Sequence, residues 1–95
     1  MTVNSNDFGL LSPTYSQIAA SALIKTGYGR VRGIFCSSTT GGTLTLYDDL
    51  VGATPLIVNT FALTASTYYN MADVAYGTGL YATIANTAEI TVFYF

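Results

Sequence analysis

The feature that most constrains the fold of this chain is a nearly continuous alternation of apolar and polar residues from residue 30 onward. The clearest segment is Thr43-Leu44-Thr45-Leu46-Tyr47, in which both leucines fall on one face and the other three side chains on the opposite face. An alternation of period two is typical of a β-strand that buries one face. The chain should therefore form β-sheet, with Leu44 and Leu46 on the same face of one strand.

Turn-forming residues divide the alternating region into short strands. Because Gly, Pro, Asp and Asn favour turns, we place connections at the clusters rich in these residues. The predicted strands are residues 30–37, 43–47, 56–61, 67–71, 80–84 and 88–94, and the connections are 39–42, 48–55, 62–66, 73–79 and 85–87. No helical segment of about 10–15 residues separates these strands, which argues against a parallel α/β sheet. The spacing predicts an all-β fold, an antiparallel β-sandwich of about seven to eight short strands.

Residues 15–25 fit two kinds of element. Their apolar side chains recur at helical spacing from Tyr15 onward, yet alternate positions from Ile18 onward also suit a strand. Alanine propensity supports the helix, whereas a strand could pair with residues 30–37 across the glycine-containing turn at 26–29. Periodicity leaves both open, and we favour the strand because of that pairing.

The first residues differ from the rest, and we divide the chain into an N-terminal arm at 1–14 and a single domain at 15–95. The arm is polar at first and then apolar, and Pro13 stops regular structure. It is either a disordered terminus or an arm that orders on a neighbouring subunit. In the second case it would bury Phe8, Leu10 and Leu11.

Few charges are available to cover the surface of so small a domain. Only 8% of the residues are charged and 51% are hydrophobic, whereas about a quarter of an ordinary domain is charged. Apolar surface should therefore remain exposed unless another chain covers it. The single cysteine cannot form a disulfide within the chain, and there is no histidine for a metal site. Self-association is the stabilising device that remains.

The charge also disfavours two classes of partner. The net charge is −2, and Lys25, Arg30 and Arg32 are the only basic residues. Clusters of lysine and arginine bind nucleic acids and anionic membranes, so we expect neither as a partner. No apolar run approaches the roughly 20 residues of a membrane span. No signal peptide is visible, and one free thiol suggests synthesis in a reducing cytoplasm.

The residues that an enzyme would need are missing from the sequence. Without histidine, the usual Ser-His-Asp and Cys-His catalytic groups cannot form. Cys36 lies inside a predicted strand, which indicates a buried structural thiol. Asp48 and Asp49 are adjacent and match no calcium-binding loop, so we interpret them as turn residues. We therefore expect no catalytic residues, no metal site and no cofactor.

Tyrosine is the residue type that points toward function, with eight tyrosines and no tryptophan. Tyrosine is common in interfaces because its large apolar ring carries a polar tip. The rings are either buried between subunits or form a stacking platform for a sugar. The residues selected as a candidate interface are Phe8, Leu10, Leu11, Tyr28, Tyr68, Tyr69, Tyr76 and Tyr81.

Four motifs follow one another in a characteristic order. They are Lys25-Thr26-Gly27-Tyr28-Gly29-Arg30, Thr43-Leu44-Thr45-Leu46-Tyr47-Asp48, Gly79-Leu80-Tyr81-Ala82-Thr83-Ile84 and a closing aromatic strand at 88–94. Over residues 18–95 this order resembles small β-sandwich structural proteins of tailed bacteriophages.

The resemblance implies a jelly-roll type of fold and a role as a capsid cement or decoration protein. Such a protein is synthesised in the host cytoplasm, becomes part of the virion and stabilises the head by binding the major capsid protein on the capsid surface, often as a homotrimer. The arm would then face the capsid or grasp a neighbour. A tail-fibre or baseplate module that binds a host receptor or a glycan is the alternative.

Overall fold

The computed structural model describes residues 12–95, and all regular elements in this range are β-strands. The strands are β1 (Thr14–Ile18), β2 (Ala22–Thr26), β3 (Gly29–Tyr47), β4 (Leu56–Ala62), β5 (Thr67–Tyr76) and β6 (Gly79–Tyr94). All their pairings are antiparallel, which confirms the predicted all-β antiparallel class. The described residues contain six strands where about seven to eight were expected from the spacing of the turns. No helix among them could cross a membrane.

The two long strands, β3 and β6, form the centre of a single sheet and pair with each other along most of their length. Every other strand pairs with one half of one of them. β1 and β2 pair with the two halves of β6, and β5 and β4 pair with the two halves of β3. The sheet therefore has four strands at either end, and β3 and β6 are common to both ends.

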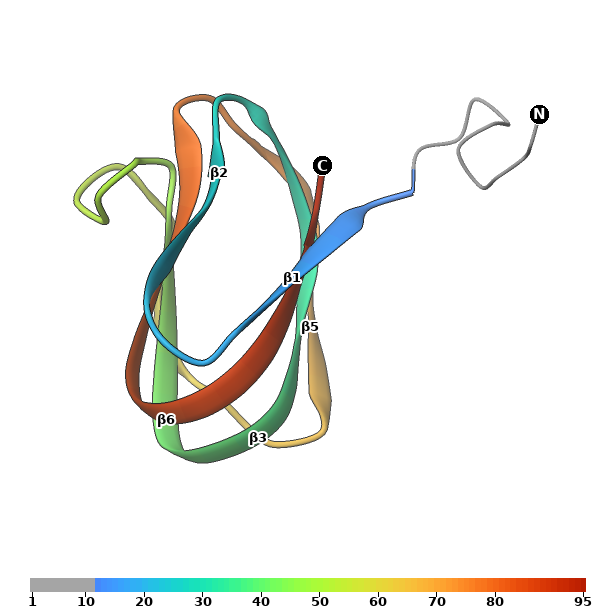
Figure 1. Ribbon diagram of the computed structural model, residues 1–95, viewed down its shortest axis with the longest axis vertical. Helices are drawn as coiled ribbons and strands as arrows, with labels where there is room; N and C mark the ends of the chain where they lie inside the picture. Colours follow the sequence, from blue (N-terminus) through green and yellow to red (C-terminus); the bar gives the residue numbers. More distant parts are fainter. Residues whose placement is uncertain (1–11) are drawn as a thin grey trace.

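β3 and β6 bend together into a U, which folds the sheet over on itself (Figure 1). We call its two sides the first limb, with β1, β5 and the adjoining parts of β3 and β6, and the second limb, with β2, β4 and the remaining parts. The inward sides of both limbs contribute to one hydrophobic core. Its fully buried side chains include Val31, Ile34 and Cys36 from the first limb and Leu44 and Leu46 from the second. Leu44 and Leu46 thus share one face of β3, as predicted, and it is the inward face. The outward sides of the two limbs point away from each other.

Two of the predicted turns, at 39–42 and 85–87, are wrong, because both strands continue through them. Gly41 and Asn86 take the positive φ values that the turn residues suggested, 64° and 63°, but they form an irregularity in the paired strands. The side-chain amide of Asn86 donates to the Gly41 carbonyl at 2.8 Å. The Thr39 hydroxyl accepts the Gly42 N–H at 2.9 Å and donates to the Thr87 carbonyl at 3.0 Å. These local bonds bend the two strands without reversing the chain, as a β-bulge does.

The strand interpretation of residues 15–25 is confirmed, with a break at 19–21 that divides the segment into β1 and β2. The predicted pairing is wrong, since β2 pairs with β6 and not with residues 30–37. Both sides of that part of β3 are already occupied, by β5 and β6. The predicted connection at 73–79 is shorter than expected, because β5 continues to Tyr76.

Most of the predicted arm at 1–14 lies outside the described residues, and so do Phe8, Leu10 and Leu11. Within the described chain, β1 begins at Thr14. It follows directly after Ser12 and Pro13.

The close contact at the bend can be tested with two adjacent glycines. A Cβ at Gly42 would lie 2.7 Å from the Thr87 carbonyl oxygen, whereas nothing lies within 4 Å of a Cβ at Gly41. We expect Gly42→Ala to lower the free energy of unfolding by about 2–3 kcal/mol, because the Thr87 carbonyl oxygen can move away only if the backbone shifts. Gly41→Ala should cost about 1 kcal/mol, through its positive φ alone. Urea unfolding measures both losses, and equal losses would contradict the importance of close packing at Gly42.

Candidate interaction surfaces

The outward side of the first limb carries a row of aromatic rings, which we call the aromatic face: Tyr15, Phe35, Tyr68 and Phe93. Strand register brings them together, because Tyr15 lies opposite Phe93 and Phe35 lies opposite Tyr68. Tyr15, Tyr68 and Phe35 are 65%, 48% and 36% exposed. Contiguous exposed rings of this kind mark a contact surface.

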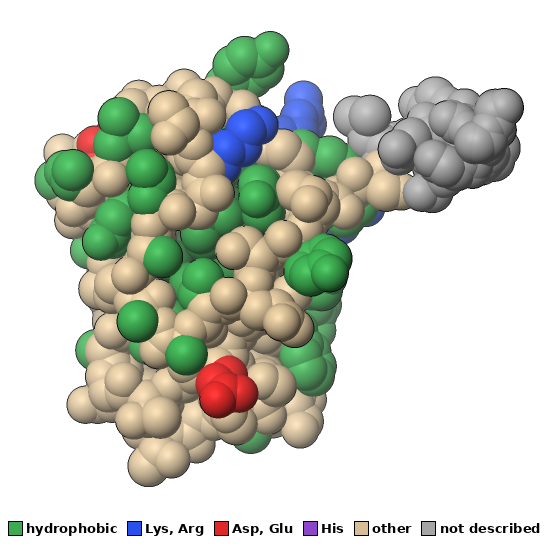
Figure 2. Space-filling view, in the orientation of Figure 1, with side chains coloured by type: hydrophobic (Ala, Val, Ile, Leu, Met, Phe, Trp, Pro, Cys, Tyr) green, Lys and Arg blue, Asp and Glu red, His purple; other side chains and the backbone are tan. Residues whose placement is uncertain are grey.

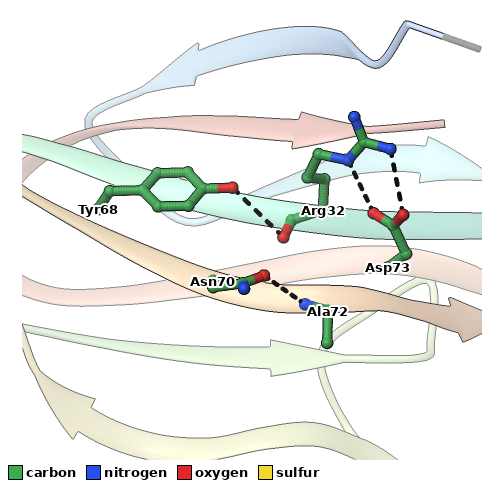
Figure 3. A network of polar contacts seen from close by, with 5 residues as sticks. All are labelled: Arg32, Tyr68, Asn70, Ala72 and Asp73. Atoms are coloured by element: carbon green, nitrogen blue, oxygen red, sulfur yellow. Dashed lines mark hydrogen bonds and ion pairs between the residues drawn. The ribbon is translucent and has the colours of Figure 1, made fainter.

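The Tyr68 ring is held across the sheet above Gly33. A Cβ at position 33 would overlap this ring, so only glycine leaves room for it. The Tyr68 hydroxyl is directed at the Arg32 carbonyl, 3.5 Å away (Figure 3). Phe93 flanks the ring, with the two centroids 6.3 Å apart. The position of the ring is therefore set by its surroundings while half of the residue stays exposed.

The aromatic face is bordered by an irregularity in β3 and β5. Arg32 of β3 has no strand-pairing partner on β5. Opposite it, residues 71–73 of β5 are not paired with β3. Ala72 and Asp73 adopt positive φ values of 57° and 54°, which non-glycine residues rarely take. The side-chain oxygen of Asn70 accepts the Ala72 N–H at 2.8 Å (Figure 3). Strained backbone of this kind is common at functional sites.

The bulge brings Arg32 and Asp73 together in a two-point ion pair (Figure 3). Nε and Nη2 of Arg32 donate to the two carboxylate oxygens at 2.9 and 3.1 Å. The guanidinium carbon also lies 4.9 Å from the centroid of the Phe95 ring. The hydrogen bond from Arg32 lowers the pKa of Asp73 and raises that of Arg32. Because both side chains are about 40% exposed, the pair adds little to stability and remains accessible to a partner.

A shallow hollow of about 210 Å³ lies farther along the same limb, toward the bend. Its polar side chains come from Gln17 of β1, Ser37 of β3, and Glu89 and Thr91 of β6. The Glu89 side chain is exposed and receives no hydrogen bond or ion pair from residues 12–95. The hollow could thus accept a hydrogen-bond donor or a cation from outside the domain.

The outward side of the second limb carries another apolar surface, which we call the aliphatic flank: Leu23, Leu50, Val51 and Leu56. Val51 is 74% exposed, and the other three are between 39% and 47% exposed. Beneath them, Tyr47 lies opposite both Tyr81 and Leu56, and Leu23 lies opposite Tyr81. Hydrophobic side chains are visible along both sides of the molecule in Figure 2, and charged ones are sparse.

Asp48 holds the loop that carries Leu50 and Val51. Its carboxylate accepts backbone N–H bonds from Gly77, Thr78 and Gly79 at 2.9, 2.7 and 3.3 Å. These donors lie at the turn between β5 and β6, so one carboxylate joins two connections that are distant in sequence. The bonds from Gly77 and Thr78 lower the pKa of Asp48. Asp49 accepts the Ala53 N–H at 2.8 Å within the loop, as expected of a turn residue.

The five tyrosines selected from the sequence do not form one cluster. Tyr68 lies on the aromatic face, and Tyr28 is 81% exposed in the connection between β2 and β3. Tyr69 and Tyr81 are partly buried within the domain. Tyr76 is buried and donates to the Phe95 carbonyl at 2.7 Å, and burial raises its pKa to about 12.

Sequence reasoning missed Tyr15, Phe35 and Phe93. Phe35 and Phe93 occupy positions of the alternation that point away from the core, and this was the signal that could have found them. Tyr15 lay in the segment that was ambiguous between helix and strand. Their grouping required the register of β1, β3, β5 and β6, which no single segment encodes.

The remaining candidate for chemistry, Cys36, is fully buried, as predicted. Its thiol lies 3.4 Å from the Ser38 carbonyl, and burial raises its pKa. Within residues 12–95, no three metal-ligating side chains gather at one place. Comparisons with models of protein families, with curated proteins and with solved structures find no match for the chain.

The role of Asp48 gives a testable dependence on pH. Because folding lowers its pKa, its carboxylate stabilises the fold above the unfolded value of about 4, and this contribution disappears as pH falls through the lower folded pKa. We expect Asp48→Ala to lower the free energy of unfolding by about 1–2 kcal/mol at pH 7, with little difference from the unchanged protein near pH 2. Urea unfolding across this range tests the expectation. An Asp48→Ala loss that did not vary with pH would contradict it.

Proposed function

We propose that this protein is a structural component of a phage virion, a capsid cement or decoration protein that stabilises the head by bridging protein subunits. The observation that carries the proposal is the pair of exposed apolar surfaces on the two outward sides of the folded sheet. A single domain with contact surfaces on opposite sides can bind two neighbours at once. That ability is what a bridging protein requires.

The composition of the surfaces supports protein partners. Protein interfaces are enriched in tyrosine, phenylalanine and arginine and contain few lysines and acidic residues at their centre. The aromatic face and Arg32 match this pattern, and Tyr15 and Tyr68 are its most exposed rings. The proposal therefore assigns the protein a binding function without catalysis, within the virion and at the capsid surface.

The fold and the assembly belong to the same proposal. The folded antiparallel sheet is consistent with a small sandwich of jelly-roll type, as the resemblance to phage proteins implies. The resemblance also implies a homotrimer. An exposed apolar surface on each outward side of the sheet gives the chain the contact area that self-association requires.

Substitutions on the aliphatic flank test the capsid role. We expect the tagged protein to copurify with the heads of the phage that encodes it, and Val51→Asp with Leu56→Asp to reduce its amount there about tenfold or more. The reason is that a charge at the centre of an apolar contact is costly to desolvate. Quantitative mass spectrometry of gradient-purified heads measures the amount.

The matched control for this test is Ala65→Asp, at an exposed position in the turn between β4 and β5. Thermal unfolding should show that all variants remain folded. Absence of the unchanged protein from heads would contradict the proposal.

A second function, glycan binding by a tail-fibre or baseplate module, is favoured by one specific observation. The fixed and half-exposed Tyr68 ring lies near the exposed Arg32–Asp73 pair. The flat side of a tyrosine ring can stack on the C–H side of a sugar ring, while planar polar groups hydrogen bond to the sugar hydroxyls. The same residues would then recognise a receptor.

The glycan alternative predicts that Tyr68→Ala abolishes binding on a glycan array, while Tyr28→Ala leaves it unchanged. Tyr28 is the matched control, because it is the more exposed tyrosine but has no such ion pair beside it. Equal effects of the two substitutions, or no binding by the unchanged protein, would reject this alternative.

A further inference from the structure

We infer that the aromatic face is the surface through which two copies of this chain pair, face to face about a twofold axis. The inference rests on the proposed capsid role and names a second copy as the partner of one of the two surfaces. It replaces the threefold assembly that the resemblance implies with a twofold one. It is argued from the charges at the two ends of the aromatic face and from the hollow at one of these ends.

Two charged side chains on this limb form no ion pair and no side-chain hydrogen bond within residues 12–95, although one of them, Arg30, lies near enough to Asp73 to lower the pKa of its carboxylate. Arg32 is paired with Asp73, Lys25 donates to the carbonyls of Tyr28 and Phe95, and the carboxylates of Asp48 and Asp49 accept backbone N–H groups. The remaining cation and anion of the described chain are Arg30 and Glu89, and both are exposed.

Arg30 and Glu89 lie on the outward side, at opposite ends of the aromatic face. Arg30 precedes the inward-facing Val31, and Glu89 precedes the inward-facing Ile90. Glu89 lies opposite Ser38, eight positions from Arg30 along β3. At about 3.3 Å per residue the two side chains are roughly 25 Å apart. The rings of Phe35, Tyr68 and Phe93 lie between them.

This arrangement is complementary to itself. If a second copy is turned through 180° about an axis that lies in the contact plane and crosses the line from Arg30 to Glu89 at a right angle, its rings meet the rings of the first copy. Arg30 of each copy then lies against Glu89 of the other. A contact of this kind is isologous, and it contains each charge pair twice. The aromatic rings form the centre and the charges the rim, which is the usual anatomy of an interface.

In this arrangement Arg30 of the second copy enters the hollow beside Glu89. Its volume of about 210 Å³ and its lining by Gln17, Ser37 and Thr91 offer oxygen acceptors around the carboxylate. A guanidinium group has five N–H donors and no acceptor, so it fits a site lined in this way. The hollow and the charge pattern therefore indicate the same partner, a second copy that contributes Arg30.

Pairing through the aromatic face leaves both aliphatic flanks on the outside of the dimer, one on each side. Each flank can then contact a separate subunit of the shell. Two linked contacts bind far more tightly than either alone, provided that both can form at once. The dimer would therefore act as a clamp between two capsid subunits.

A charge swap tests the inference. Light scattering coupled to size exclusion should give a mass of about twice 10.1 kDa for the unchanged protein. Arg30→Glu and Glu89→Arg should each weaken the dimer about tenfold or more, because each places like charges together twice. The double variant R30E/E89R should restore the dimer, since it re-forms both pairs with the signs exchanged.

Two controls make the outcome decisive. Val51→Asp, on the aliphatic flank, should leave the dimer unchanged, and Phe35→Ser, at the centre of the aromatic face, should weaken it. A monomer at all concentrations, a trimer that does not respond to the swaps, or a double variant as weak as the single ones would overturn the inference. Binding to phage heads is measured separately. A monomer that still binds heads through Val51 leaves the proposed function standing, whereas a swap-sensitive dimer absent from heads rejects that function alone.

Discussion

The pairing of β3 with β6 is the interaction on which the rest of the structure depends. Each of the other four strands pairs only with β3 or only with β6. Without this central pair, β1 and β2 would be separated from β4 and β5, and isolated pairs of short strands are marginal in water. Because Val31 pairs with Tyr94 across most of the chain, the contact is long-range. Forming it therefore requires closing a large loop, which slows folding in proteins of this kind.

The bend in this central pair determines where the functional surfaces lie. Bending brings the inward sides of both limbs into one core and turns their other sides outward. The domain is small and has few charges, so part of each outward side remains apolar. One side is aromatic and the other aliphatic. A straight sheet of the same sequence would expose the core residues, and its two apolar surfaces would lie on the same side.

The aromatic face is held more rigidly than the aliphatic flank, and this difference bears on their roles. The aromatic face lies on paired strands, and the position of Tyr68 is set by Gly33 beneath it and Phe93 beside it. Side chains fixed in this way lose little conformational freedom on binding. Part of the aliphatic flank lies on a loop that Asp48 attaches to the turn between β5 and β6. A face on rigid strands suits a permanent contact between copies, and a loop surface suits adaptation to a different protein.

The sequence by itself determined the secondary-structure class and much of the core. Alternation predicted β-strands and the placement of Leu44 and Leu46 on one face, because the side-chain direction in a strand depends only on position. The position of Cys36 inside a predicted strand indicated a buried thiol. It also indicated an excess of apolar surface, and Tyr68 was among the residues selected for contact. It did not identify Tyr15, Phe35 and Phe93 as neighbours of Tyr68.

Only the tertiary structure decided whether Gly41 and Asn86 reverse the chain or bend it. These residues permit a positive φ in either case, and the outcome depends on whether a partner strand continues alongside. The neighbours of β2 and the composition of the aromatic face were decided in the same way. Strand register is a relation between distant segments, so it becomes defined only when those segments pack together.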